Sequence, residues 1–218
     1  MKTPLELTEY FLDPDLKWIT SGDDTQYCFT KEGNENILLF AESNSKVDWK
    51  NNFTFFRKPY RHMETTFYVH GGFLKCWKLI HNDILEYVSN CKMDNLTIAG
   101  WSYGGALATL CTEDLWFNNP MLKTRTVTFG SPKVLSIFGF RKAQERFNNM
   151  FMFKNGADII TTLPFSIMGF KHVTNLTKIG ERPKLFNYFK PRVYHNMIYK
   201  TVYGYVPILQ SLLKDEEI

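Results

Sequence analysis

The amino-acid sequence predicts an α/β fold in which a mostly parallel central sheet is flanked by helices. The first supporting observation is that short apolar runs, such as residues 126–129 and 150–153, alternate with segments of helical spacing. That alternation is typical of a parallel sheet covered on both faces. The second is a Gly-x-Ser-x-Gly motif between a strand-like run and a helix-like run. We expect a single domain over residues 1–218, a length that one hydrophobic core accommodates.

The first expected elements are a helix and a hairpin. An amphipathic segment at 5–12 precedes two strand-like runs, at 25–30 and 37–41. The polar residues 31–35 join these runs, which favours an antiparallel hairpin. We expect a polar and aromatic loop over residues 42–66.

The later elements repeat the pattern of strand and helix. After a short strand at 67–70, apolar residues recur at three- and four-residue steps over 73–88, which predicts a long helix. Strands are expected at 126–129 and 150–153, with a mostly polar helical segment at 141–148 between them. In sheets of this kind, function collects at the carboxyl ends of the strands.

The Gly-x-Ser-x-Gly motif predicts a nucleophile at Ser102. Gly100 and Gly104 flank it at two residues' distance. A sharp turn from strand to helix leaves no room for a Cβ at those positions. Such a turn raises the serine hydroxyl above the sheet and is the nucleophile elbow of an α/β-hydrolase.

A serine nucleophile requires a base, and the base requires an anionic partner. In α/β-hydrolases these follow the serine in the order acid, then histidine. Asp158 follows the run at 150–153 and is the candidate acid, with a turn or helix cap as the alternative. His195 lies in a late loop and is the candidate base. His172 lies in a stretch that alternates like a strand, so we expect a structural role for it.

Composition and charge exclude several classes of function. A net charge of +4 without a Lys/Arg block gives no reason to expect a nucleic-acid partner. The cysteines and histidines lack the spacing of metal ligands, so we expect no metal and no cofactor. No signal-peptide-like or membrane-spanning run is visible in the sequence, and we therefore expect an intracellular location.

The chain resembles the class 3 lipases, the fungal triacylglycerol lipase-like branch of the α/β-hydrolases. Five sequence blocks match those of the family in order, at residues 69–73, 99–108, 128–134, 155–164 and 194–199. The resemblance implies a catalytic triad of Ser102, Asp158 and His195. It also implies that Ser43 and the backbone N–H of Tyr103 form the oxyanion hole.

One departure from the family pattern lies in the oxyanion segment. Glu42 stands where the family has glycine. A carboxylate near a developing oxyanion would raise the barrier, so we expect the Glu42 side chain to point to solvent or to a basic neighbour.

The resemblance implies a serine carboxylester hydrolase that cleaves acylglycerol esters through an acyl-enzyme. A phospholipase A1-type enzyme, an esterase of soluble esters and a non-catalytic lipase-like binding module are the alternatives. The expected partner is a lipid or other ester substrate. Residues 53–61 combine aromatic and basic side chains, which favours transient contact with a membrane or lipid interface. An ordinary loop that packs its Phe residues on the core is the alternative for this segment.

Overall fold

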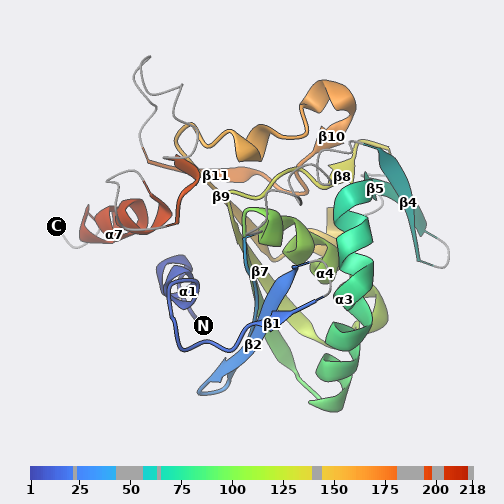
Figure 1. The fold of residues 1–218 in the computed structure, drawn as a ribbon, viewed down its shortest axis with the longest axis horizontal. Coiled ribbons are helices and arrows are strands. Elements are labelled where there is room, and N and C mark those ends of the chain that lie inside the picture. The colour runs from blue at the N-terminus through green and yellow to red at the C-terminus, as the bar shows by residue number, and fades with distance from the viewer. Residues whose placement is uncertain are drawn as a thin grey trace.

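The computed structural model describes residues 1–21, 24–42, 56–62, 65–138, 144–180, 194–197 and 204–215. A seven-stranded sheet runs through the molecule with helices on both of its faces (Figure 1). In spatial order its strands are β1 (Ile19–Thr20), β2 (Gln26–Glu32), β3 (Glu35–Phe40), β6 (Asn95–Trp101), β7 (Lys123–Phe129), β9 (Met150–Asn155) and β11 (Leu176–Ile179).

Most of this sheet is parallel, as the sequence predicts. Strands β3, β6, β7, β9 and β11 pair in parallel, whereas β1, β2 and β3 pair antiparallel. The β2–β3 pair is the expected hairpin. In the parallel part, Phe40 is in register with Gly100, and Trp101 with Phe129. The carboxyl ends of β3, β6 and β7 therefore lie side by side.

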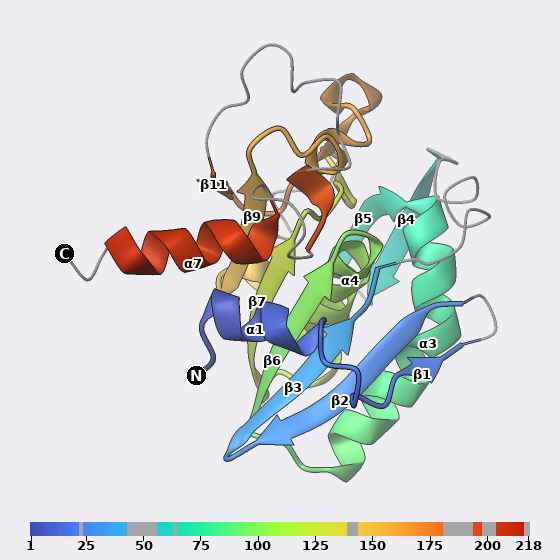
Figure 2. The same ribbon diagram turned by 60° about the vertical axis from the view of Figure 1, so that its left-hand side comes forward.

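In the part of the chain that the structure describes, two long helices cover one face of the sheet and two shorter ones cover the other (Figure 2). They are α1 (Pro4–Tyr10), α3 (Gly71–Asn90), α4 (Tyr103–Asn118) and α7 (Tyr205–Asp215). The alternation of side chains along β3 divides the core between the faces. Leu38 and Phe40 join the cluster under α3 and α4, whereas Ile37 and Leu39 join the cluster under α1 and α7.

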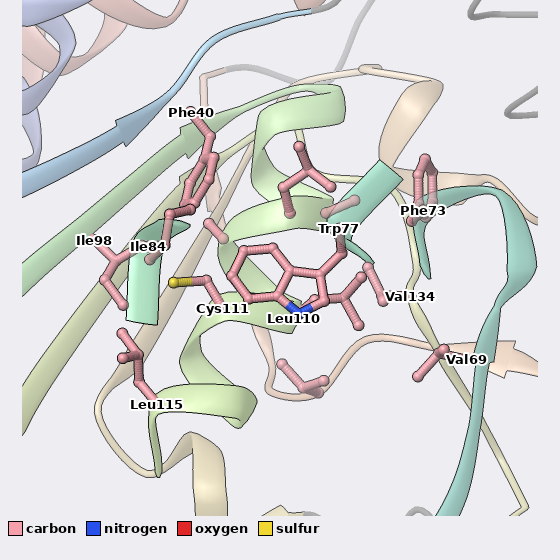
Figure 3. Close-up of a cluster of buried hydrophobic side chains, with 14 of the residues drawn as sticks. Phe40, Val69, Phe73, Trp77, Ile84, Ile98, Leu110, Cys111, Leu115 and Val134 are labelled. Carbon is pink, nitrogen blue, oxygen red and sulfur yellow. The ribbon is translucent and has the colours of Figure 1, made fainter. Parts of the chain in front are cut away.

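The core between the sheet, α3 and α4 centres on Trp77, which is 1% exposed. Figure 3 shows its ring beside Leu110 and Cys111 of α4. The indole Nε1–H donates to Asp114 Oδ2 at 2.8 Å, so the polar end of this large side chain is satisfied inside the core. Among the described helices, none is long and apolar enough to cross a membrane.

A second, smaller sheet was not expected from the sequence. Its four antiparallel strands, in spatial order, are β10 (Phe170–Lys171), β8 (Leu135–Ser136), β5 (Thr65–His70) and β4 (Arg57–His62). The expected loop over residues 42–66 thus contains a strand from Arg57. The expected strand at 67–70 is part of β5, which belongs to this sheet and not to the central one. Pro59 is tolerated because β4 lies at the edge of the sheet.

The helix expected at 141–148 is a single 3-10 turn, η1 (Gln144–Phe147); residues 141–143 lie outside the described ranges. Arg146 and Phe147 are both buried there, and Arg146 forms an ion pair with buried Glu113 of α4. These anchors hold the segment close to α4. Two further 3-10 turns, η2 (Ile160–Thr162) and η3 (Ser166–Met168), follow β9.

Candidate active site

The turn from β6 into α4 holds Ser102 in a strained conformation. Its φ of 55° and ψ of −123° are unusual for a residue with a side chain. A Cβ at Gly100 would lie 2.3 Å from the Gly104 oxygen, and a Cβ at Gly104 would lie 2.1 Å from the Phe40 oxygen. Both glycines are therefore required for this turn. Strain of this kind costs about 1–3 kcal/mol and clusters at functional sites.

His195 connects Ser102 with Asp158. The Ser102 Oγ lies 2.6 Å from Nε2 of His195, and Nδ1 of the same ring lies 3.0 Å from both carboxylate oxygens of Asp158. An acid at Nδ1 favours the tautomer in which Nδ1–H donates to the carboxylate and Nε2 accepts the serine proton. The exposed fractions are 1% for Ser102, 0% for Asp158 and 7% for His195.

Asp158 lies in the turn after β9 and accepts hydrogen bonds from two groups besides His195. The Ile160 N–H donates to Oδ1 at 3.0 Å, and the Tyr205 hydroxyl donates to Oδ2 at 2.7 Å. Burial and the neighbouring Asp158 raise the pKa of Tyr205 well above its usual range. The hydroxyl therefore keeps its proton and remains a donor to the carboxylate.

Gly130, directly after β7, borders the Asp158–His195 pair. Its φ is +61°, a backbone conformation that favours glycine. A Cβ at this position would lie 2.7 Å from Asp158 Oδ2 and 2.9 Å from His195 Nδ1. The absence of a side chain at Gly130 thus leaves the space that the acid and the base occupy.

The short segment that carries His195 is anchored on both sides. Tyr194 is 3% exposed and Met197 is fully buried. Asn155 Nδ2 donates to the Tyr194 oxygen at 3.1 Å, and Trp101 Nε1 donates to the His195 oxygen at 3.2 Å. The orientation of the imidazole therefore depends on residues from β9 and from the end of β6.

Sequence reasoning missed Tyr205 and Asn155. Tyr205 is the first residue of α7, and 47 positions separate it from Asp158. Its hydroxyl also accepts the Asn155 N–H at 3.1 Å. No spacing rule identifies a tyrosine so distant from the acid that it supports, because the contact exists only after α7 packs on the sheet.

His172 lies beside the turn after Asp158 and makes no hydrogen bond to Ser102. Its Nε2 is 2.7 Å from the Thr161 oxygen, which the N–H tautomer satisfies as a donor. Burial lowers the pKa of His172 to about 4, so the ring is neutral near pH 7. Of the two downstream histidines, the structure places His195 next to Ser102 and His172 next to the turn that follows Asp158.

The predicted oxyanion hole is only partly within the described residues. Tyr103 is the first residue of α4, and its amide belongs to a helix N-terminus, where negative charge is favoured. Ser43 lies outside the described ranges. Glu42 faces a basic neighbour, since its Oε1 lies 3.9 Å from His195 Nε2 with the side chain 29% exposed. Burial raises the pKa of Glu42, and the nearby His195 opposes that rise.

Metal-ligating side chains do not gather in the part of the chain that the structure describes. Within those ranges, no group of three or more His, Cys, Asp or Glu residues could hold a metal ion. None of the four cysteines, all of which are described, forms a disulfide. Cys111 is fully buried in the core, whereas Cys91 is exposed.

Three proteins illustrate what the chain is similar to. A secreted mono- and diacylglycerol lipase from Fusarium solani is 26% identical over 153 residues, which cover 68% of this chain and 45% of the relative. A secreted mono- and diacylglycerol lipase from Penicillium cyclopium is 30% identical over 109 residues, covering 47% of this chain and 34% of the relative. The structure of the native Rhizomucor miehei lipase–propeptide complex superposes with a TM-score of 0.62 at 25% identity, covering 76% of this chain and 57% of that one.

Two facts follow from these relatives. The chain spans less than half of the length of the Fusarium and Penicillium proteins. Both of those proteins are described as secreted, which contradicts the intracellular location expected from the sequence. The expectation was wrong because it rested on the lack of a recognisable leader, and that lack carries no information about where a protein acts.

The strongest relationship is at the level of the family. The model of the lipase (class 3) family matches residues 37–168, which is more than half of the chain. The match begins in β3 and runs through the elbow to the turns after Asp158. The α/β-hydrolase fold of the structure agrees with it. The chain therefore belongs to the class 3 lipase family.

Proposed function

We propose that this chain is a serine carboxylester hydrolase that acts on lipid esters. The observation that carries the proposal is the hydrogen-bonded line from Ser102 Oγ through His195 to Asp158, with links of 2.6 and 3.0 Å. Membership of the class 3 lipase family supports it. Hydrogen-bonded Ser–His–Asp triads of this geometry activate a serine nucleophile in enzymes with unrelated folds.

The reaction proceeds in two halves. His195 Nε2 takes the proton of Ser102 as Oγ attacks the ester carbonyl, and Asp158 stabilises the resulting imidazolium. The imidazolium then gives the proton to the leaving alcohol oxygen, and an acyl group remains on Ser102. Water next attacks the acyl-enzyme while His195 takes a proton from it. The imidazolium then returns this proton to Ser102 Oγ as the bond between Oγ and the acyl carbon breaks, and the carboxylic acid product is released.

The developing oxyanion is stabilised by the Tyr103 N–H and by Ser43. The position of Tyr103 at the N-terminus of α4, directly after the nucleophile, supports its part. The part of Ser43 rests on the family pattern, since the residue is not described. Ser43→Ala should lower kcat by an amount that corresponds to about 2–4 kcal/mol of transition-state stabilisation. A neutral result would place the second donor elsewhere.

Acylglycerols are the proposed substrates, because the Fusarium and Penicillium relatives are mono- and diacylglycerol lipases. Contact with a lipid interface through residues 53–61 remains part of the proposal; residues 53–55 are not described. Phe56 is 72% exposed and directly precedes basic Arg57 and Lys58, which supports such contact. Measuring the hydrolysis rates of emulsified acylglycerols, phospholipids and dissolved esters would show which of these substrate classes the chain prefers.

A fluorophosphonate probe and three variants test the proposal. The probe should label the unmodified chain and fail to label Ser102→Ala, which should keep at most about a thousandth of the esterase activity. His195→Ala should lose activity to a similar degree, because members of a triad act as a unit. His172→Ala, the matched control, should lose stability but keep most of its activity. An unlabelled wild-type protein would favour a non-catalytic binding module instead.

A further inference from the structure

A second carboxylate faces the proposed catalytic base from the side of the serine. Glu42 Oε1 lies 3.9 Å from His195 Nε2, the same nitrogen that lies 2.6 Å from Ser102 Oγ. Asp158 occupies the other side of the ring, at Nδ1. The imidazole therefore stands between two carboxyl groups, only one of which the triad uses.

The backbone that leads to Glu42 is held firmly against the elbow. The Ala41 N–H donates to the Gln26 oxygen at 3.0 Å. The oxygens of Phe40 and Ala41 pack so closely on α4 that a Cβ at Gly104 would lie 2.1 and 2.5 Å from them. The place of Glu42 beside His195 thus follows from how β3 ends against the nucleophile turn.

The alcohol part of an ester has to pass close to this carboxylate. To receive its proton, the leaving oxygen must come within about 3 Å of His195 Nε2. Glu42 Oε1 lies 3.9 Å from the same nitrogen, so the leaving oxygen lies no more than about 7 Å from this carboxylate oxygen, and groups attached to it come within range of the Glu42 charge. When His195 is protonated, its charge offsets one of the two carboxylates, Asp158 or Glu42. The other carboxylate stays negative, in addition to the oxyanion that formed when Ser102 lost its proton.

We propose that Glu42 is a specificity-determining residue that selects esters by the charge of their alcohol part, favouring cationic alcohols and disfavouring anionic ones. This inference rests on the hydrolase function proposed above and adds a substrate class to the same site. It concerns the alcohol, because the acyl group stays bonded to Ser102 while the alcohol is the group that His195 protonates.

The expected size of the effect follows from Coulomb's law. A unit charge about 6 Å from the carboxylate changes the rate by about threefold at the dielectric constant of water and by about a hundredfold at an effective value near 20. The change has opposite signs for a cationic and an anionic alcohol. The two esters should therefore differ by about tenfold or more in kcat/KM.

The test uses three soluble butyrate esters whose alcohols have similar size and different charge. They are the esters of choline, of 3,3-dimethylbutan-1-ol and of 2-hydroxyethanesulfonate, which carry positive, zero and negative charge. The wild-type chain should cleave them in that order of kcat/KM. In Glu42→Gln the ratios should fall toward one, and in Glu42→Lys the order should reverse. Because each ratio is taken within one enzyme, partial loss of folding does not affect it.

A matched control separates the local charge from the net charge. Glu86 is exposed on α3, about 20 Å along the helix from its start. Glu86→Gln removes the same charge from the chain and should keep the wild-type ratios. Equal loss of the ratios in this variant would overturn the assignment to Glu42.

The remaining outcomes distinguish the two proposals. If the wild-type chain cleaves none of the esters and takes no fluorophosphonate label, the hydrolase function fails and the inference falls with it. If it cleaves all three esters with equal kcat/KM, or if Glu42→Gln keeps the wild-type ratios, the hydrolase function stands and the inference about Glu42 is overturned.

Discussion

Replacing Gly130 with alanine should damage the acid–base pair far more than it damages the fold. The new Cβ would lie 2.7 Å from Asp158 Oδ2 and 2.9 Å from Cε1 and Nδ1 of His195. Ordinary contact begins at 3.4 Å, so these groups have to retreat by about 0.5 to 0.7 Å. Neither can move freely, because Asp158 is fully buried and His195 is 7% exposed.

We expect Gly130→Ala to lower both kcat/KM and the free energy of unfolding. A misplacement of about 1 Å in an active site can cost about a hundredfold in rate, so Gly130→Ala should lower kcat/KM by roughly 10- to 100-fold. Alanine at the observed φ of +61° should also lower the free energy of unfolding by about 1–2 kcal/mol. The assays are hydrolysis of 4-nitrophenyl butyrate and unfolding in urea.

Gly33 provides the matched control for this variant. It lies in the β2–β3 turn with a φ of +58°, and a Cβ there would meet no atom within 4 Å. Gly33→Ala should therefore show the same loss of stability and no loss of activity. Equal kcat/KM for Gly130→Ala and Gly33→Ala would refute the packing of Asp158 and His195 against Gly130.

Three further predictions concern the surroundings of the acid. Tyr205→Phe removes a hydrogen bond to the buried Asp158 carboxylate and should lower the free energy of unfolding in urea by about 1.5–3 kcal/mol. An unchanged urea midpoint would speak against that bond. Burial lowers the pKa of His172 from 6.5 to about 4, so the unfolded chain binds its proton first and stability should fall as the pH drops from 6.5 toward 4. In His172→Gln, the decrease in the free energy of unfolding between pH 7 and pH 5 should be smaller than in the wild type by up to about 2 kcal/mol, measured by urea unfolding at these two pH values. Lys133 Nζ donates to the oxygens of Thr162 and Pro164, and Lys133→Met should lower stability by about 2–3 kcal/mol because these acceptors lose their donor; an unaltered Tm would contradict this.

Short-range patterns in the sequence explain why the central sheet and the elbow were predictable. The elbow depends on Gly100, Ser102 and Gly104, which are close in sequence and have one steric reason to be there. The β2–β3 hairpin and the parallel strands β6, β7 and β9 contain short apolar runs, whereas β11 has none and was not expected from the sequence. Asp158 and His195 were accessible as candidates because chain order limits which acid and which histidine a serine at the elbow can use.

The second sheet and the support of the acid have no comparable signal. Strand β4 contains Pro59 and three basic side chains, which are typical of a loop. Strands β8 and β10 are two residues long, too short for any periodicity. The hydrogen bond from Tyr205 to Asp158 joins segments that meet only through tertiary packing. A local pattern cannot encode a contact of that kind.

The position of Tyr205 at the start of α7 ties the chemistry of the site to the order in which the chain becomes structured. The serine, the proposed acid, the proposed base and this tyrosine follow one another at positions 102, 158, 195 and 205. Helix α7 packs beside α1 over the hydrophobic cluster on that face of the sheet (Figure 2). A partly folded chain with its central strands paired but α7 undocked would have an elbow, but its Asp158 carboxylate would lack the hydrogen bond from Tyr205. The rate of ester hydrolysis would therefore report the docking of α7 on Asp158, whereas circular dichroism would already register the sheet.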